Sequence, residues 1–386
     1  MESHSDAIVI GAGIIGATTA LALTQAGFRV TVIDRGGMAH GTTSRGEGNI
    51  LVSDKSPGPE LELALRSRDL WFELDSQVGG GFELEPKGGV VVARSEIGAH
   101  ALGDLAADQR RNGVDVKGLG AKELHELEPY LDKTIENGAF YPQDAQCQPM
   151  LAAAKILKTV QIAGGTLALN AEVKSVNVDS GRIAGVETTR GFHAAPIVVN
   201  ATGTWANHIA QMAGSSLPIA PRRGFILVTA PAPKLIFHKV YDADYVANVA
   251  SGSANLQTSA VIEGTQSGTI LIGASRERVG FNNQINYEAI KILAAQAISL
   301  FPILKNIQLL RIYHGFRPYA PDHLPVIGQD AKVEGLWHNV GHEGAGIGLA
   351  PGSAELLTAL ITETKGFMSA DPFSPTRFTG NQGVTT

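Results

Sequence analysis

The chain has 386 residues, enough for two or three domains at the usual size of about 150 residues each. With 44% hydrophobic and 18% charged residues, the composition excludes a disordered chain, a collagen-like repeat and a disulfide-stapled mini-protein. The net charge of −6 argues against nucleic acid as the main partner, because phosphate binding requires a cationic surface. Cys147 is the one cysteine, so an internal disulfide and a thiolate metal cluster are excluded.

Residues 7–23 carry no charge, and the run is close to the lower limit of about 17 residues for a membrane span. Its three spaced glycines instead divide it into a strand and a helix. Glu2 and Asp6 precede it without any Lys or Arg, which does not fit a signal peptide. We therefore expect a soluble cytoplasmic protein, with peripheral membrane contact left open.

The hydrophobic pattern predicts a βαβ unit at the start of the chain, with strands over 7–10 and 29–33 and a helix over 14–26. Further helices are predicted over 61–74, 123–127, 150–162, 287–300 and 353–361, the last with an alternative start near Gly346. Further strands are predicted over 88–94, 166–169, 173–178, 183–189 and 197–199. Residues 221–280 are rich in Val, Ile, Thr and Ser and predict sheet, whereas the tail from Thr379 predicts disorder.

A dinucleotide-binding pattern lies between the first strand and the first helix, as Gly11-Ala12-Gly13-Ile14-Ile15-Gly16. In such a motif Gly11 allows the tight turn, Gly13 lets a pyrophosphate approach the backbone, and Gly16 lets the helix pack on the strand. Asp34 ends the second strand, where a carboxylate accepts hydrogen bonds from a ribose and repels a 2′-phosphate. The motif therefore predicts FAD or NAD rather than NADP.

Three later segments favour FAD over NAD. The hydroxyl-rich turn over 41–49 suits a second phosphate and a ribityl chain, and residues 199–203 bring a buried strand to a glycine turn. The third segment, Gly341-His342-Glu343-Gly344-Ala345-Gly346-Ile347-Gly348, runs into a helix. Unpaired backbone N–H groups at a helix start are suited to the anionic edge of a reduced flavin.

Across residues 7–378 the sequence resembles the FAD flavoproteins of the glycine oxidase, D-amino-acid oxidase and dehydrogenase, and sarcosine oxidase group. The matching motifs are GAGIIG at 11–16, TTSRGEGN at 42–49, VNATGTW at 199–205, GFRPYAPDHLPVIG at 315–328 and GHEGAGIGLAP at 341–351. Segments 47–61 and 341–351 look most like the catalytic subunits of heteromeric dehydrogenases that act on D-hydroxyproline, opines or glycine.

The resemblance implies roles for individual residues. Ile14 and Ile15 would contact the pyrophosphate, Asp34 and Arg35 the adenosine, and Val173 the adenine. Flavin contacts are expected from the early loop and from the residues before the last helix: Thr42, Thr43, Ser44, Glu47, Gly48, Asn49, Gly203, His342, Glu343, Gly344, Ala345, Gly346, Ile347 and Gly348. Arg317 matches the arginine that binds the substrate carboxylate.

The sequence departs from the family pattern at three places. Covalent sarcosine oxidases carry a cysteine near the GFRP motif, where this chain has Tyr319-Ala320, so we predict non-covalent FAD. Gly344 stands where some glycine oxidases have an arginine, so a second cationic substrate contact is expected to be missing. The family's substrate tyrosine has no unambiguous match, and Tyr241 and Tyr245 are the candidates.

Arg317 is also a candidate from its chemistry, because a planar guanidinium fits a carboxylate through two parallel hydrogen bonds; the alternative is a structural salt bridge. Three further cases have alternative interpretations. His314 either faces the substrate or fills the core, and Glu47 either meets a substrate amine or caps its loop. His338 and His342 have a zinc-ligand spacing, but Gly341 between them argues against the helix that such a site needs. We expect no metal.

We therefore predict a mixed α/β enzyme with two discontinuous domains: a Rossmann-like FAD-binding domain over 1–83, 146–215 and 316–365, and a β-rich substrate domain over 84–145 and 216–315, followed by a tail over 366–386. The expected reaction is hydride transfer from the carbon next to an amino group to flavin N5, giving an imine that hydrolyses to an oxo acid. The electron acceptor, O2 or a partner subunit, stays open, as do self-association and association with other chains. The rivals are a flavin-bearing subunit of a heteromeric dehydrogenase and an NAD-dependent dehydrogenase.

Overall fold

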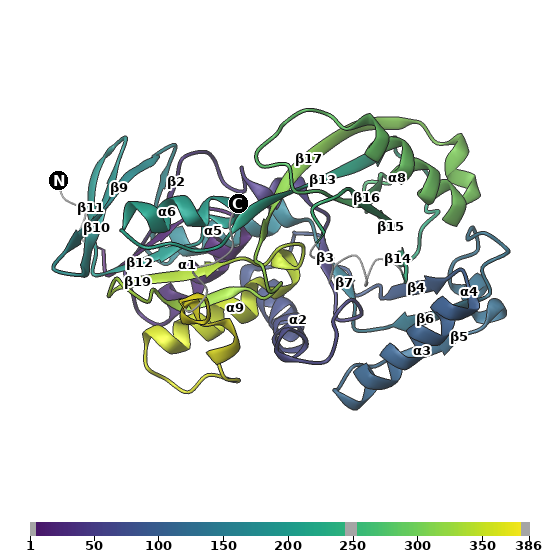
Figure 1. Ribbon diagram of the computed structural model, residues 1–386, viewed down its shortest axis with the longest axis horizontal. Coiled ribbons are helices and arrows are strands. Elements are labelled where there is room, and N and C mark those ends of the chain that lie inside the picture. The colour runs from purple at the N-terminus through teal and green to yellow at the C-terminus, as the bar shows by residue number, and fades with distance from the viewer. Residues whose placement is uncertain (1–4, 244–252, 380–386) are drawn as a thin grey trace.

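A computed structural model describes residues 5–243 and 253–379 of the chain. It has the mixed α/β architecture that the sequence predicts, with helices packed on two large sheets (Figure 1). The prediction of a disordered tail falls almost entirely outside the described residues.

The first sheet has six strands in the order β18-β19-β12-β1-β2-β8. Its centre is the predicted βαβ unit, in which β1 (Ala7–Ile10) pairs in parallel with β2 (Val30–Asp34). The flanking strands come from distant parts of the chain: β8 (Thr166–Leu169), β12 (Ile197–Asn200), β18 (Val326–Gln329) and β19 (Leu336–Val340). Only β18 runs antiparallel. The buried, uninterrupted apolar run of β1 is typical of a parallel strand covered on both faces.

Helices cover this sheet and form one hydrophobic core with it. The first helix, α1 (Ile14–Gln25), packs against α5 (Pro149–Ile162) and α9 (Gly346–Ile361). The long helix α2 (Pro59–Val78) packs against α9 in turn. Thr18 in α1 donates to the carbonyl oxygen of Ala350 over 3.1 Å, which ties the first and last long helices together.

Two small sheets and short helices complete this half of the molecule. The antiparallel sheet of β9 (Val173–Asp179), β10 (Arg182–Thr188) and β11 (Gly191–Ala194) lies at one end (Figure 1). The short strands β3 (Asn49–Ile50) and β7 (Ala145–Gln146) pair with each other. Shorter helical segments are η1 (Thr42–Arg45), η2 (Gly203–Trp205), α6 (Ala206–Met212), η4 (Asp371–Phe373) and η5 (Pro375–Phe378).

The second large sheet has eight strands in the order β17-β13-β16-β15-β14-β4-β6-β5. They are β4 (Gly89–Ala93), β5 (Lys117–Leu119), β6 (Asn137–Tyr141), β13 (Ala220–Thr229), β14 (Lys239–Asp242), β15 (Gln257–Gly264), β16 (Ile270–Arg276) and β17 (Leu309–Tyr319). Alternate side chains of β4 enter different cores, because Val90 and Val92 pack with β13, β15 and α8 (Tyr287–Leu300) whereas Val91 joins the core around α1. The sheet is thus packed on both faces.

The two large sheets draw on separate sets of chain segments, and on this ground we propose the two-domain division given above. The strand β17 has a particular place in it. Its register with β13 extends from Ala220 opposite Tyr319 to Thr229 opposite Leu309. Along this ladder, β17 brings the GFRP motif at residues 315–318 toward the glycine turn that follows β1.

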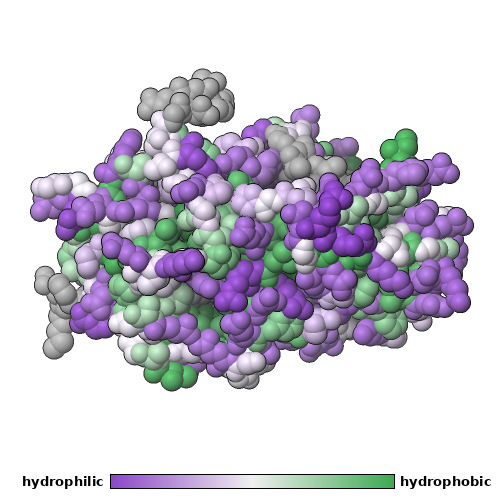
Figure 2. All heavy atoms as spheres, turned by 90° about the horizontal axis from the view of Figure 1, so that it is seen from below, coloured by the Kyte–Doolittle hydropathy of each residue, from purple (hydrophilic) through white to green (hydrophobic). Residues whose placement is uncertain are grey.

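Several elements of the described residues are absent from the sequence-based predictions. Among the helices these are α3 (Glu96–Arg111), which packs on β4 and β6, and the short helix α6. Among the strands they include β5, β6, β11, β17, β18 and β19. The predicted helix over 123–127 is α4 (Ala121–Leu127), and the remaining helical segment is η3 (Pro302–Asn306). Within the described ranges, no helix combines the length and the hydrophobicity needed to cross a membrane. Figure 2 shows polar side chains over most of one face, with hydrophobic residues in groups between them.

Candidate functional site

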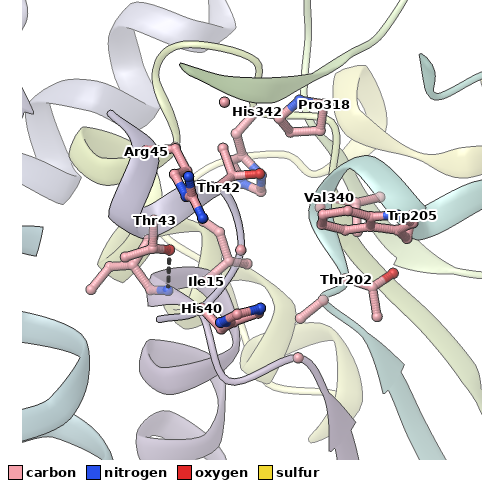
Figure 3. Close-up of a pocket in the computed structure, with 18 of the residues that line it drawn as sticks. Ile15, His40, Thr42, Thr43, Arg45, Thr202, Trp205, Pro318, Val340 and His342 are labelled. Carbon is pink, nitrogen blue, oxygen red and sulfur yellow. Dashed lines mark hydrogen bonds between the residues drawn. The ribbon is translucent and has the colours of Figure 1, made fainter. Parts of the chain in front are cut away.

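A cavity of about 230 Å³ lies where the glycine turn after β1, the loop over 41–49 and the end of β17 meet. In the close-up, Arg45, Thr42 and Thr43 lie on one side of the cavity, and Trp205, Val340 and Thr202 lie on the opposite side (Figure 3). The lining includes most of the residues that the sequence singles out: Gly11, Gly13, Ile14, Ile15, Asp34, Arg35, Thr42, Thr43, Glu47, Asn49, Val173, Gly203, Arg317, His342, Glu343, Gly344, Gly346 and Ile347.

The glycine turn leaves no space for side chains. A Cβ on Gly11 would lie 2.4 Å from the carbonyl oxygen of Ala201, and one on Gly16 would lie 1.8 Å from that of Gly11. Gly11 also has a φ of +117°, which is accessible to glycine and strained for other residues. The helix α1 starts at Gly13 without a side-chain cap and without an acidic residue in its first turn. Its positive dipole end therefore faces the cavity and is available to an anionic group such as a pyrophosphate.

Asp34 and its neighbours form one wall of the cavity. The Asp34 carboxylate accepts hydrogen bonds from the amides of Ala12 and Gly36, both at 2.7 Å. Each carboxylate oxygen retains a further lone pair, so the group can also accept from ribose hydroxyls. The Arg35 guanidinium lies over the ring of Trp205 at 4.0 Å from its centroid, and both side chains line the cavity. A flat cationic and aromatic surface of this kind is suited to a purine ring.

The loop over 41–49 is tied both to the glycine turn and to β17. Thr43 accepts a hydrogen bond at Oγ1 from the amide of Ile14 over 3.0 Å (Figure 3). Thr42 donates to the carbonyl oxygen of Phe316 over 2.9 Å, and Thr204 donates to the same oxygen over 2.7 Å. Gly48 packs against the chain at Cys147, where a Cβ would lie 1.8 Å from the Cys147 carbonyl oxygen. The hydroxyl groups therefore fix the loop and the end of β17 relative to each other.

The glycine-rich loop before α9 covers the other side of the cavity. His342 is buried and lies 2.9 Å from the Ser353 hydroxyl, and burial lowers the pKa of His342 to about 3. Glu343 pairs with Arg222, which is fully buried, and with His323 at 2.9 Å. Although burial alone would raise the pKa of Glu343, its hydrogen bond with His323 and the charge of Arg222 keep that pKa below its usual value. Glu343 is thus held as a carboxylate by protein cations.

Arg317 enters the cavity from β17, where it is paired with Arg222 of β13. Its Nη1 donates to the carbonyl oxygen of Ser275 over 2.7 Å, and its side chain is half-buried. Two glycines make room for it: a Cβ on Gly224 would lie 2.0 Å from Nη1, and one on Gly344 would lie 3.7 Å from Nε. The guanidinium is therefore oriented by the backbone, at the side of the cavity formed by the eight-stranded sheet.

Glu47 is the acidic group beside Arg317, and it is 7% exposed. Its Oε1 lies 3.6 Å from Nζ of Lys239, which itself donates to Glu263 over 2.6 Å. Burial raises the pKa of Glu47, the charge of Lys239 lowers it, Glu263 raises it and Arg317 lowers it. Glu47 is therefore a buried acid between two cations.

Several predicted residues lie elsewhere. Tyr241 is fully buried and bonds through its hydroxyl to Ser53, outside the cavity lining. His314 contacts the rings of Phe225 and Phe316 and bonds to Asn283 at 3.2 Å. Behind the lining are Gly16, Ser44, Gly48, Ala345 and Gly348. Tyr245 lies outside the described residues.

The two histidines with zinc-ligand spacing have separate partners. His338 is on β19, between Asp330 at 2.9 Å and Asn200 at 3.3 Å, whereas His342 turns to Ser353. In residues 5–243 and 253–379, no group of three His, Cys, Asp or Glu side chains is placed to bind a metal ion.

Other lining residues are missing from the sequence-based predictions, among them His40, Arg45, Trp205, His208, Pro318, Asn339 and Val340. Trp205 belongs to the VNATGTW motif and His40 directly precedes the loop over 41–49, so their sequence positions gave a signal. The signal for Arg45 was similar, because it lies within the TTSRGEGN motif.

Comparison with known proteins identifies the architecture. The family model described as FAD dependent oxidoreductase (DAO) matches residues 6–360. The chain belongs to the DAO family of FAD dependent oxidoreductases. Glycine oxidase of Geobacillus kaustophilus is 29% identical over an alignment of 393 residues, which covers 100% of this chain and 100% of its own. Hydrogen cyanide synthase subunit HcnC of Pseudomonas aeruginosa is 27% identical over 98% of this chain and 97% of its own.

Solved structures agree with this family. L-proline dehydrogenase from P. horikoshii superposes with a TM-score of 0.89 at 26% identity, over 98% of this chain and 99% of its own. Glycine oxidase from Geobacillus kaustophilus superposes with a TM-score of 0.87 at 27% identity, over 97% of this chain and 99% of its own. The glycine turn and Asp34 are compatible with either FAD or NAD. Membership of the DAO family selects FAD. The buried Cys147 does not line the cavity, which agrees with non-covalent FAD.

Proposed function

We propose that this DAO-family protein oxidises the C–N bond of an amino acid or secondary amino acid with FAD as the electron acceptor. The observation that carries the proposal is the position of Arg317. Its guanidinium is oriented by Ser275 and lies in the same cavity as the glycine turn, Asp34 and the loop before α9. The names of the relatives, glycine oxidase and L-proline dehydrogenase, are consistent with a substrate of this class.

The residues present fit FAD. The glycine turn and the first turn of α1 would take the pyrophosphate, Asp34 the ribose, and Arg35 with Trp205 the adenine side. The loop over 41–49 and the loop before α9 would hold the isoalloxazine and ribityl parts. When bound, FAD supplies the capacity to accept two electrons and a hydrogen from the substrate carbon.

The protein groups then act by positioning. Arg317 binds the substrate carboxylate through two parallel hydrogen bonds, which fixes the carbon next to the amino group relative to the cofactor. Gly344, in the loop before α9, brings no cation beside Arg317. We therefore expect Arg317 to bind the carboxylate without a second cation from that loop. The product imine hydrolyses to an oxo acid and an amine in water.

The test is reduction of the bound flavin without oxygen. The purified holoprotein is mixed with glycine, sarcosine, L- and D-proline, D-hydroxyproline, D-alanine and octopine, and the visible flavin absorbance is followed. We expect at least one of these compounds to bleach the flavin. The corresponding amino alcohols keep the amine but lack the carboxylate, and we expect them to leave the flavin oxidised. A flavin that no amino acid reduces would contradict the proposal.

A second candidate is that the chain is the flavin-bearing subunit of a heteromeric dehydrogenase. The specific observation in its favour is the match to a protein named as a subunit over nearly the whole of both chains. The same preparation distinguishes the two, because an oxidase forms hydrogen peroxide in air. A subunit reduces a dye or a co-purified chain and forms little peroxide.

A further inference from the structure

We propose that Glu47 binds the substrate ammonium group and accepts its proton, so that the amine becomes neutral inside the cavity. This inference rests on the proposed amino-acid oxidation and adds to it a catalytic residue and a preference for substrates that enter as cations. The loop position of Glu47 alone would suit a flavin contact equally well. The neighbours of its carboxylate favour the substrate.

The first step of the argument is the unsatisfied oxygen. Glu47 lines the cavity, yet among the described residues its Oε1 has no hydrogen-bond partner. Its other oxygen receives a long contact of 3.5 Å from the side-chain amide of Asn49. The nearest cation, Nζ of Lys239, lies 3.6 Å from Oε1, so the hydration that this carboxylate has lost is only partly replaced. A ligand that donates a charge-assisted hydrogen bond to Oε1 would replace the remainder.

The second step is the position of that oxygen. Glu47 lines the same cavity as Arg317, and its Oε1 lies toward β16, where a Cβ on Gly273 would be 2.8 Å away. The charge of Arg317 acts on Glu47 from the same cavity. A cationic side chain and an anionic side chain in one small cavity match the two charged ends of an amino-acid zwitterion. The Arg317 end takes the carboxylate and the Glu47 end takes the nitrogen.

The third step is chemical. Oxidation at carbon requires the nitrogen lone pair, which an ammonium group does not have. Transfer of one proton breaks an N–H bond of the ammonium and forms an O–H bond on Glu47. The products are a neutral amine and a neutral carboxylic acid, and nothing is oxidised or reduced. Burial raises the pKa of Glu47 and so reduces the energy difference that this transfer must overcome.

The charged and titratable groups around Glu47 come from several elements. Lys239 on β14 and Glu263 on β15 face it from the sheet, and Arg317 and Tyr313 face it from β17. Cys147 lies behind Gly48 and is kept as a thiol, since burial raises its pKa. Burial also raises the pKa of Tyr313. Of Glu47, Glu263, Cys147 and Tyr313, Glu47 is the group that lines the cavity.

The experiment is the pH profile of flavin reduction without oxygen, measured as kred/Kd for the best substrate of the screen. In the unaltered protein we expect kred/Kd to rise as Glu47 ionises and then to stay level up to the pKa of the substrate amine. In Glu47→Gln the protein must bind substrate that is already neutral. Its kred/Kd is then expected to rise about tenfold per pH unit up to the amine pKa, with a loss of about 100-fold at pH 7.

Glu263→Gln is the matched control, because Glu263 contacts the same lysine but does not line the cavity. Glu263 raises the pKa of Glu47, so its removal is expected to move the acid limb to lower pH and to keep the level region. Glu47→Asp retains a carboxylate and is expected to keep a level region as well. Bound FAD is measured by absorbance in each variant.

The outcomes separate this inference from the function on which it rests. If no amino acid reduces the flavin of the unaltered protein, the proposed function fails. If the flavin is reduced but kred/Kd of the unaltered protein follows the ionisation of the amine up to its pKa, only the role of Glu47 fails. The same holds if Glu47→Gln lowers FAD content and leaves the shape of the profile unchanged. This measurement on the unaltered protein decides the point even where Glu47→Gln does not fold.

Discussion

His342 is a fully buried imidazole that the fold keeps neutral. Its pKa is lowered to about 3 by burial, while a histidine in an unfolded chain titrates near pH 6.5. Between these values the unfolded chain binds a proton that the native protein does not. The native state therefore loses stability as the pH falls through this range, by up to about 1.4 kcal/mol per pH unit.

Replacing His342 by glutamine removes this titration and retains a side-chain N–H that can donate to Ser353. Between pH 7 and pH 5 the free energy of unfolding of His342→Gln is expected to fall by about 2 kcal/mol less than that of the unaltered protein. Urea unfolding of both proteins at the two pH values measures the difference. Acidic groups titrate in both and cancel in the comparison, so an equal pH dependence would show that His342 is protonated in the native state.

Arg317 is expected to act on substrate affinity more than on FAD. Arg317→Ala removes the group that pairs with the carboxylate, and KM for an amino-acid substrate should rise by about 100-fold or more. Arg317→Lys keeps the charge but not the planar pair of donors, so an intermediate KM is expected. Steady-state kinetics and flavin absorbance are measured together. An unchanged KM in the alanine variant would remove Arg317 from the substrate site.

Individual residues also mark the limit of what the sequence predicts about the site. The motif around Arg317 predicts its place in the cavity, because the surrounding residues are characteristic of the family. Tyr241 was a candidate because of its type and its β-rich segment, but alternation along β14 turns it to Ser53 and the core. Residue type gives chemistry, whereas the direction of a side chain depends on strand register, which is set by distant partners.

At the level of elements, the contact between β3 and the β6–β7 turn depends on one buried acid. Asp144 accepts hydrogen bonds from the amides of Val52 at 2.8 Å and Ser53 at 3.2 Å, and from the Ser53 hydroxyl. Two of these donors are backbone amides in a segment that directly follows the loop over 41–49. Asp144 thus links the segment after the loop over 41–49 to the eight-stranded sheet.

Asp144→Ala leaves these donors buried without an acceptor, and the free energy of unfolding should fall by on the order of 3 kcal/mol. Asp115→Ala serves as the control, because Asp115 is exposed in the same part of the chain and is expected to change stability by less than about 0.5 kcal/mol. Denaturant unfolding gives both values. Equal stabilities of the two variants would contradict the role given to Asp144.

Some elements were predictable from local pattern and others were not. The strand β1 is a short apolar run before the glycine motif, the apolar helix α1 follows that motif, and α5 and α8 have clear apolar periodicity. The structure confirms all four. For α3 a local signal existed, because Ser95 caps the helix by accepting from the amide of Gly98. The strand β17 has exposed and half-buried residues without alternation, and its conformation comes from pairing with β13. Pairing of that kind is a long-range property.

At the level of the whole molecule, both large sheets contribute walls to the cavity described above. The βαβ unit lies on one side, and Gly224, Gly315 and Arg317 of the eight-stranded sheet lie on the other. A cofactor that fills this space contacts both sheets at once. FAD binding should therefore stabilise the fold as a whole rather than one sheet alone.

FAD in excess at about 100 times its Kd is expected to add about 2.7 kcal/mol to the stability of the FAD-free protein and to raise Tm by several degrees. NAD at the same concentration is the control, because it shares the adenosine and pyrophosphate groups but has no isoalloxazine. A thermal scan of FAD-free protein with each compound makes the measurement. If NAD raised Tm as much as FAD, the assignment of the flavin side of the cavity would be wrong.

Arg317 belongs to a strand that pairs with β13 along its whole length, rather than to a loop. Because backbone pairing holds the strand in place, the position of Arg317 is fixed, and it cannot shift to follow substrates of different size. Under the proposed function, short and long amino acids would all place their carboxylate at one point and extend from there. Chain-length selectivity would then be decided at the opposite end of the cavity, and related enzymes could diversify there without moving the anchor.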